Sequence, residues 1–132
     1  DRLNSRGLTA RADVVRRDLG ARFEGLRFGG YAKGGVRAGH MKGSAHYAGR
    51  AIDVFFRPVN RANKVRGWAA AHYLVANASR LHIDTVIYDA KIWTHRRSHQ
   101  GWRDYVIDTA GKPASVRRVL LHRDHVHVDV AD

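Results

Sequence analysis

Apolar residues near the start of the chain recur every three or four positions, which is the period of an amphipathic helix. The pattern predicts a helix over residues 8–23, with Leu8, Ala12, Val15, Leu19 and Phe23 on its buried side. Residues 1–7 precede the pattern, and we expect a flexible lead-in there. A second helix is expected to run from an N-cap at Asn63 to about Ser79. Its predicted buried stripe consists of Val65, Trp68, Ala69, Tyr73 and Ala76.

Alternation of apolar and polar residues, which is typical of half-buried strands, is clearest over residues 125–130. There His125, His127 and Asp129 share one face, and three valines share the other. Residues 51–56 also predict a strand, with Asp53 on the face opposite Ile52 and Val54. We expect shorter strands at 26–28, 85–88 and 105–107, a polar loop at 94–101, and either a helix or a strand at 115–121.

The segment between residues 29 and 50 is rich in glycine and shows no period of either kind. Long loops of this sort inside a small domain are usually functional. The order of elements predicts an α+β fold, with a small, mostly antiparallel β-sheet and flanking helices. A chain of 132 residues has room for one hydrophobic core, so we expect a single domain over residues 1–132.

The composition gives the chain a strong positive charge and excludes several kinds of chemistry. Lys and Arg total 24 and Asp and Glu total 12, which gives a net charge of +12. Such a charge attracts polyanions, although a basic surface without a specific partner is an equally good interpretation. The chain has no cysteine, which excludes disulfides, thiolate zinc clusters and a cysteine nucleophile. No apolar run is long enough to predict a membrane span.

Two segments carry the candidate chemistry. The first runs from Ser44 to Asp53 and contains His46 at the end of the glycine-rich loop. The second is the strand bearing His125 and His127. Two histidines on one strand face are costly to bury unless something binds them. His46, Asp53 and one strand histidine would offer two nitrogens and one oxygen, a donor set that suits zinc with a fourth position open. The alternative is that His46, Asp53 and the strand histidines are separate polar residues that form no common site.

The spelling Ser44-x-His46-x-x-Gly49-x-Ala51-x-Asp53, followed by His125-x-His127, resembles the LAS group of zinc peptidases. That group includes the lysostaphin-type enzymes, the D-Ala-D-Ala metallopeptidases and the zinc domain of hedgehog proteins. The first motif is closest to the D-Ala-D-Ala metallopeptidase branch. The Gly101-Trp102-Arg103 element and the Asp124–Val128 ending are similar to secreted actinobacterial C-terminal domains. The resemblance covers residues 23–130 and implies the LAS-type peptidase core.

The resemblance also implies roles for individual residues. His46, Asp53 and His127 match the zinc ligands, with one Zn²⁺ per chain. Asp124 matches the general base, and His125 matches a histidine that stabilises the oxyanion. Relatives often carry a Tyr-Arg pair whose arginine polarises the substrate carbonyl, but this chain has Tyr31-Ala32.

Four further residues are assigned from their positions in the sequence. Arg37 is the nearest replacement for the missing arginine, with a surface charge as the alternative. Ser44 is expected to support His46 or the substrate, and Trp102 to form a wall of the substrate cleft or to pack in the core. Asp129 is expected to orient His127 or to face solvent. His40 lies in the glycine-rich loop and could approach the site, although an exposed position is favoured. We expect the other histidines to be structural or exposed: His72, His82, His95, His99 and His122.

The sequence therefore predicts a secreted, cell-wall-associated, monomeric zinc peptidase that hydrolyses the D-amino-acid-containing peptides of bacterial peptidoglycan. The basic surface would hold it on anionic wall polymers. Both a D,D-carboxypeptidase and an endopeptidase fit the motifs; the glycine-rich loop and the absence of an evident carboxylate-binding cluster favour the endopeptidase. Two alternatives belong to other classes. One is a catalytically weak, zinc-bearing module that binds wall polymer. The other is a basic, metal-dependent nucleic-acid-binding protein, which the lack of a dense basic stripe or a nucleic-acid motif disfavours.

Overall fold

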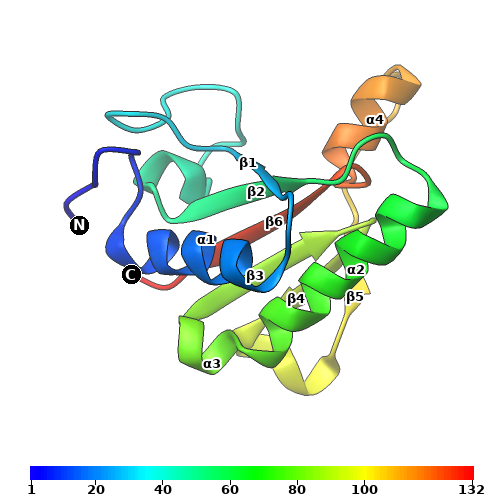
Figure 1. Ribbon diagram of the computed structural model, residues 1–132. Helices are drawn as coiled ribbons and strands as arrows, with labels where there is room; N and C mark the ends of the chain where they lie inside the picture. The colour runs from blue at the N-terminus through cyan, green and yellow to red at the C-terminus, as the bar shows by residue number, and fades with distance from the viewer.

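The computed structural model describes residues 1–132 and has an α+β fold built on one six-stranded antiparallel sheet (Figure 1). The strands are β1 (Arg27–Gly29), β2 (Ala51–Phe55), β3 (Ile83–Tyr88), β4 (Lys91–Thr94), β5 (Arg103–Asp104) and β6 (His125–Val130). The helices are α1 (Ala10–Arg22), α2 (Arg61–Ala76), α3 (Ala78–Leu81) and α4 (Ala114–Leu120), with 3₁₀ helices η1 (Ala45–Ala48) and η2 (His95–Gln100). The strand order is β1-β2-β6-β3-β4-β5, so the last strand of the chain lies in the middle of the sheet.

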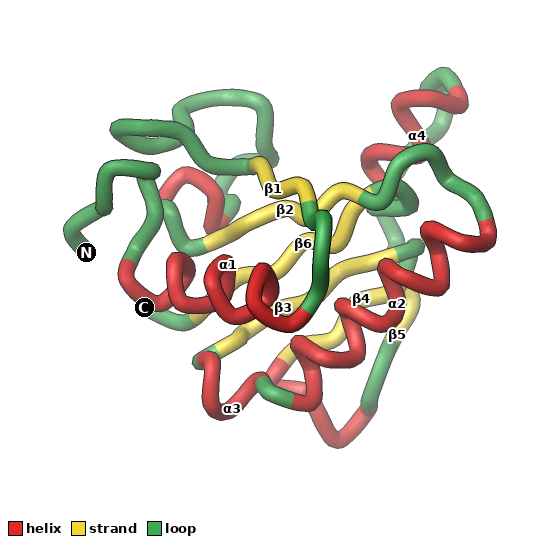
Figure 2. Tube along the Cα trace, in the orientation of Figure 1, coloured by secondary structure: helices red, strands yellow, loops and turns green.

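The two faces of the sheet have different partners. One face carries the valines of β6 together with Ile52 and Val54 of β2, and it is buried in the core cluster. Helices α1, α2 and α3 cover this face (Figure 2). The alternation expected for β2 and β6 is confirmed, because their polar residues lie on the other face, away from these helices.

Helix α1 matches the period seen in the sequence. Its buried residues are Ala12, Val15 and Leu19, and Thr9 caps its N-terminus by accepting a hydrogen bond from the Ala12 N–H. Before it, the Asn4 side chain accepts hydrogen bonds from two backbone N–H groups, and Gly7 is buried. Part of the expected lead-in therefore forms an ordered turn against the domain.

The prediction for the second helix was wrong in its cap and in its buried side. Asn60, not Asn63, caps α2, and the helix ends at Ala76, after which α3 is a separate short turn. The residues that α2 buries are Gly67, Ala70, Ala71 and Leu74, while Val65 is exposed. Small residues on this side let the helix approach the sheet closely, and apolar residues lie almost all round it, which makes its period ambiguous.

Several short elements also differ from the expectation. η2 occupies most of the segment 94–101 that was predicted as a loop, β4 was not predicted, and β5 lies at Arg103–Asp104 rather than at 105–107. β3 begins two residues earlier than expected. The segment 115–121 is helical and forms α4, which buries none of its residues. These elements are short, so tertiary pairing decides them rather than local pattern.

Two irregular arms stand above the polar face of the sheet. One is the glycine-rich loop after β1, which ends in η1, and the other is the segment from β5 through α4 (Figure 1). Both contribute residues to the cavity described below. No helix in the chain has the length and apolar character that crossing a bilayer requires.

Candidate metal centre

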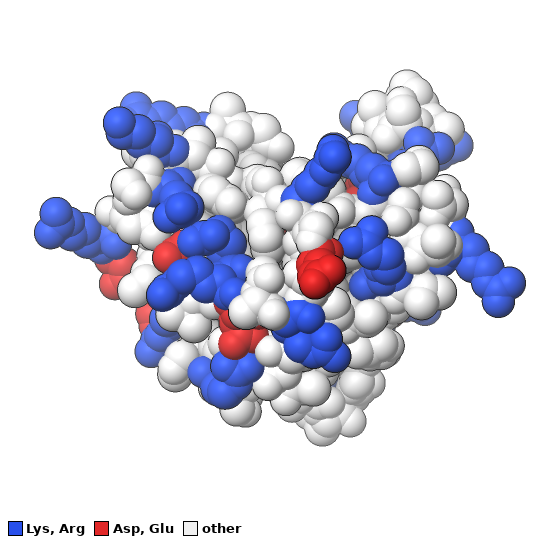
Figure 3. Space-filling view, viewed as in Figure 1, with Lys and Arg blue, Asp and Glu red and all other residues white.

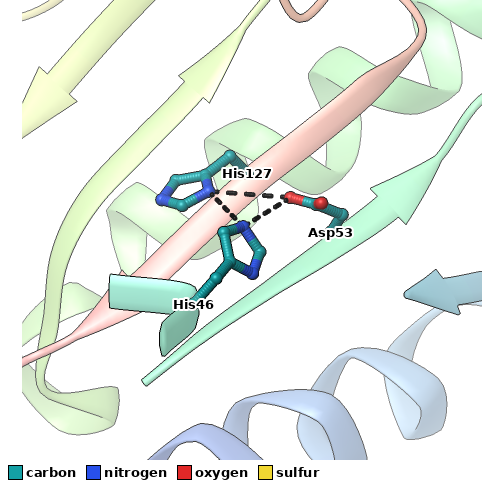
Figure 4. Close-up of side chains that lie close together, drawn as sticks. All are labelled: His46, Asp53 and His127. Atoms are coloured by element: carbon teal, nitrogen blue, oxygen red, sulfur yellow. Dashed lines mark hydrogen bonds and ion pairs between the residues drawn. The ribbon is translucent and has the colours of Figure 1, made fainter. Parts of the chain in front are cut away.

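His46, Asp53 and His127 meet on the polar face of the sheet, and all three are buried (Figure 4). His46 comes from η1, whose first turn is capped by the Ser44 hydroxyl accepting from the His46 N–H at 3.3 Å. Asp53 and His127 are opposite each other in the β2–β6 ladder. The antiparallel register thus places one ligand from each strand side by side, and η1 brings the third over them.

The ring nitrogens that face one another are fixed by the hydrogen bonds on the far side of each ring. The His46 Nδ1–H donates to the Gly30 carbonyl at 2.8 Å, which leaves Nε2 as a lone pair. The His127 Nε2–H donates to Asp129 at 2.8 Å, which leaves Nδ1 as a lone pair. This carboxylate–histidine arrangement is the one that commonly orients metal-binding histidines, and it gives Asp129 the orienting role expected for it.

The three facing atoms fit a metal ion. His46 Nε2 lies 3.1 Å from His127 Nδ1 and 3.3 Å from Asp53 Oδ1, and His127 Nδ1 lies 3.6 Å from the same oxygen. Ligands about 2.0–2.1 Å from a tetrahedral zinc are about 3.3 Å apart. Asp53 Oδ1 is buried and has no hydrogen bond of good geometry. Two ring nitrogens and a buried carboxylate oxygen therefore converge on one point, where a metal ion would satisfy all three.

In the metal-free site, His127 and Asp53 each shift the pKa of the other. Burial opposes charge on His127, yet the carboxylates of Asp129 and Asp53 raise its pKa to about 9. Burial would also raise the pKa of Asp53, but the imidazoles of His127 and His46 lower it below its ordinary value. Without metal, the site thus holds a proton on His127 beside an ionised Asp53, and a metal ion must displace that proton.

A second pair of residues lies next to the ligands. His125 Nδ1 is 2.7 Å from Asp124 Oδ1, and the other oxygen of Asp124 is 2.8 Å from Arg57 Nε. His125 Nε2 lies 4.0 Å from Asp53 Oδ1. Desolvation raises the pKa of Asp124, but its hydrogen bonds to His125 and Arg57 outweigh this and lower it. Asp124 therefore contacts the ligand cluster only through His125.

The cluster opens onto a cavity of about 750 Å³. One wall is the glycine-rich loop from Gly39 to His46, and the opposite wall includes Tyr105, Ile107 and Leu120 of the segment through α4. The floor is the polar face of the sheet. A cavity of this size accommodates a short peptide segment or another small molecule.

Two of the predicted site residues do not line this cavity. Arg37 is exposed on the glycine-rich loop and lies outside the cavity wall. For Trp102 the structure agrees with the second interpretation, packing in the core, because its ring packs edge-on against Trp68 at 5.1 Å and near His72 at 6.0 Å. Trp102 directly precedes β5, and its ring lies against Trp68 of α2 on the helical side of the sheet. Ser44 does line the cavity and supports His46 as described.

The structure brings two further histidines to the site, for which the sequence favoured an exposed or structural role. The His40 ring stacks on His46 at 3.9 Å between centroids, and Tyr47 holds the His40 backbone by accepting from its N–H and donating to its carbonyl. His122 lines the cavity and packs 4.5 Å from the His125 ring. Burial lowers the pKa of His122 to about 3, so the ring is neutral. In the sequence, the only indication that His122 lies near the site is its position three residues before His125.

Gly30 is a third residue that the sequence did not single out. It has a φ of +80°, and a Cβ there would lie 2.5 Å from His46 Cε1 and 2.9 Å from Asp53 Oδ2. Its carbonyl also orients His46. The glycine richness of the loop was visible in the sequence, but the glycine that matters was not.

Comparison with known proteins gives one family. The model of the VldE C-terminal domain family matches residues 4–115. The matched segment contains His46 and Asp53 and ends before β6, which carries His127. No curated protein and no solved structure matches the chain.

Proposed function

The chain belongs to the VldE C-terminal domain family, and we propose that it is a zinc-dependent peptidase acting on the peptides of bacterial peptidoglycan. The observation that carries the proposal is the buried His46–Asp53–His127 triangle at the floor of an open cavity. Three protein ligands with an accessible fourth side are typical of catalytic rather than structural zinc. The peptide substrate rests on the resemblance of the two motifs to LAS zinc peptidases, and we propose a core of that type.

The residues around the triangle support hydrolysis. Bound zinc would supply a Lewis acid and an acidified water at this point. His125 directs Nε2 toward the ligand cluster, because Asp124 accepts the hydrogen bond from its Nδ1–H. That nitrogen is placed to accept a proton and then donate it to the leaving amine, or to stabilise the oxyanion. Asp124 is matched to the general base by the resemblance, and its contacts with Arg57 and His125 let it orient His125 as well.

The test combines metal binding with turnover. Chelator-stripped protein is titrated with zinc by calorimetry, and peptidoglycan digests are then followed with and without added zinc. We expect about one zinc per chain, with peptide cleavage that chelator removes and zinc restores. Folded protein that binds no zinc, or cleavage that persists undiminished in chelator, would contradict the proposal.

A zinc-bearing module that binds wall polymer is the second candidate. It is favoured by the two engaged oxygens of Asp124 and by the position of Arg37 outside the cavity. The substitution Asp124→Ala separates the two functions. A peptidase loses turnover in this variant, whereas a binding module keeps its retention on intact cell walls.

The basic surface supports attachment to an anionic wall polymer in either case. Lys and Arg side chains are spread over the visible face in separate groups rather than in one stripe (Figure 3). We therefore propose a diffuse electrostatic attraction in a secreted, cell-wall-associated protein that acts as a monomer. Retention on anionic walls should fall steadily between low and high salt. Retention that is independent of salt would remove this part of the proposal.

A further inference from the structure

Strand β3 shifts its register against β6 by one residue, as at a β-bulge. Ile83 pairs with Val130, and Thr85 pairs with Asp129. β3 therefore takes two steps where β6 takes one, and Asp84 is the extra residue. Bulges are frequent next to active sites, where they redirect a side chain.

The bulge turns the Asp84 side chain toward the polar face of the sheet. Ile83 and Val86 both belong to the core cluster, although they are three residues apart. In a regular strand, an odd separation places two side chains on opposite faces. The bulge changes this alternation, so Asp84 and Thr85 both lie on the face away from the core. Asp84 is accordingly exposed, and it lines the cavity above the polar face.

Three carboxylates line the cavity, and Asp84 is the one without a partner. Asp53 faces the ring nitrogens of His46 and His127, and Asp129 accepts a hydrogen bond from His127. Asp84 accepts no hydrogen bond and pairs with no basic side chain, in a chain with 24 Lys and Arg residues against 12 Asp and Glu residues. A carboxylate left free among so many cations is available to a cation from outside the protein.

The cations of the cavity wall do not neutralise Asp84. Arg57 and Arg50 each pair with another carboxylate, at 2.8 Å and 3.0 Å. Lys42 is exposed on the glycine-rich loop and forms no ion pair. The charge of Asp84 therefore remains uncompensated within the cavity.

Asp84 lies close to the candidate metal ligands, but farther along the sheet. The register places it beside Asp129, which is two residues from His127 on β6. Two residues of a strand span about 7 Å. In the other direction the cavity continues to Phe55, which pairs with His125. A peptide that lies along the strands thus extends past the ligands on both sides, and the group that reaches Asp84 is a side chain rather than a chain end.

We propose that Asp84 binds a side-chain ammonium of the substrate, so that the site selects peptides with a diamino acid close to the bond that is cut. This inference rests on the proposed peptidase function and deepens it. A lysine-type side chain supplies a compact positive charge with three N–H donors on a flexible stem. A peptide with an uncharged side chain at this position would leave the carboxylate with water only.

The experiment compares two Nα-acetylated peptidoglycan stem peptides that differ only in the residue before D-Ala-D-Ala, which is lysine or Nε-acetyllysine. With zinc-loaded protein, we expect kcat/KM to be about 3- to 5-fold higher for the lysine peptide, which is what an ion pair at an exposed carboxylate contributes. In Asp84→Asn this ratio should fall to about one. Asp84→Lys should prefer a third peptide, with glutamate at the same position, over the lysine peptide.

The matched control is Glu24→Gln, which changes the net charge of the protein by the same amount. Glu24 is exposed and lies outside the cavity, so this variant should keep the ratio. If Asp84 only shapes the bulge, Asp84→Asn lowers kcat/KM equally for both peptides and leaves the ratio unchanged, which overturns the inference. Equal cleavage of both peptides by the unsubstituted protein overturns it as well, while the proposed function stands.

A binding measurement makes the inference independent of turnover. The lysine and acetyllysine peptides are titrated by NMR into metal-free protein. We expect the lysine peptide to bind about 3- to 5-fold more tightly, and this preference to disappear in Asp84→Asn and to weaken at high salt. Failure to cleave any peptide, together with this preference, refutes the peptidase and keeps the ammonium site. Equal affinities for the two peptides refute the ammonium site, whatever the turnover.

Discussion

Single residues around the candidate metal ligands fix the orientation and the tautomer of the histidine rings. His46 and His127 each use their outer ring nitrogen to hold one tautomer, through the Gly30 carbonyl and the Asp129 carboxylate. The inner nitrogens then face Asp53 as lone pairs. Metal affinity should therefore depend on residues that never touch the metal.

Gly30→Ala is expected to weaken zinc binding by about 10- to 100-fold, the usual effect of disturbing residues behind metal ligands. The new methyl group would press on His46 and Asp53, as its distances of 2.5 and 2.9 Å show. The dissociation constant from calorimetry is the measurement. Gly34→Ala is the control, because Gly34 has a φ of +81° but no atom within 4 Å of an added Cβ. Equal weakening in both variants would mean that backbone strain, not contact with the ligands, is responsible.

His122 should make the metal-free protein sensitive to acid. Its folded pKa is about 3 and its ordinary value is 6.5, so below pH 6.5 the unfolded chain binds a proton that the folded chain excludes. The free energy of unfolding should therefore fall as the pH drops from 6.5 toward 3. His122→Asn removes this group and tolerates the positive φ of 55° at this position.

The measurement is denaturant unfolding at a series of pH values. We expect a shallower decline with falling pH in His122→Asn than in the unsubstituted protein. His72→Gln changes an exposed histidine and should leave the slope unchanged. Parallel slopes in all three proteins would contradict the role given to His122.

At the scale of elements, the closest packing is between α2 and β3. A Cβ on Gly67 of α2 would lie 2.3 Å from the Tyr88 hydroxyl oxygen, so glycine is required for the helix to sit where it does. Tyr88 is fully buried, and its hydroxyl has no hydrogen-bond partner. The close contact between α2 and the sheet thus encloses the Tyr88 hydroxyl without a hydrogen-bond partner.

Tyr88→Phe is expected to raise the free energy of unfolding by about 1 kcal/mol, because it removes an unsatisfied buried hydroxyl. Denaturant unfolding measures the change. Tyr73→Phe is the matched control, since the Tyr73 hydroxyl donates to Asp18 at 2.5 Å and its removal should lower stability. A loss of stability in Tyr88→Phe would show that its hydroxyl has a partner in solution.

At the scale of the whole molecule, the candidate metal ligands come from distant parts of the chain. His46 and His127 are 81 positions apart and come from η1 and β6. The unfolded chain does not hold these ligands in place, so zinc should bind the folded state selectively. At 100 times its dissociation constant, zinc should then add about 2.7 kcal/mol to the free energy of unfolding.

This stabilisation should raise the melting temperature by roughly 10 °C for a domain of this size. It should also grow as the pH rises toward 9, because zinc displaces the proton that the raised pKa of His127 retains. Differential scanning calorimetry at several pH values measures both effects. His127→Ala should show no zinc-dependent shift. A shift of equal size in that variant would place the metal elsewhere.

The sequence by itself determined the strands β2 and β6 and helix α1, and it predicted His46, Asp53 and His127 as the group that the structure brings together as a candidate metal site. These depend on alternation, on a helical period and on motif spelling, all of which are local in the chain. The buried side of α2 and the places of β4 and β5 were not determined, because they follow from pairing with distant residues. For the same reason, only the fold decided between the two interpretations of Arg37 and of Trp102.

Only the tertiary structure decided which residues surround the metal ligands. Gly30, His40, His122 and Arg57 reach the site from four separate segments, and no motif in the sequence assigns them to it. Their neighbourhood results from the order β1-β2-β6-β3, which places the last strand between the second and the third. Motif residues are recognisable because chemistry restricts their identity, whereas supporting residues are defined by contact, which exists only in the folded chain.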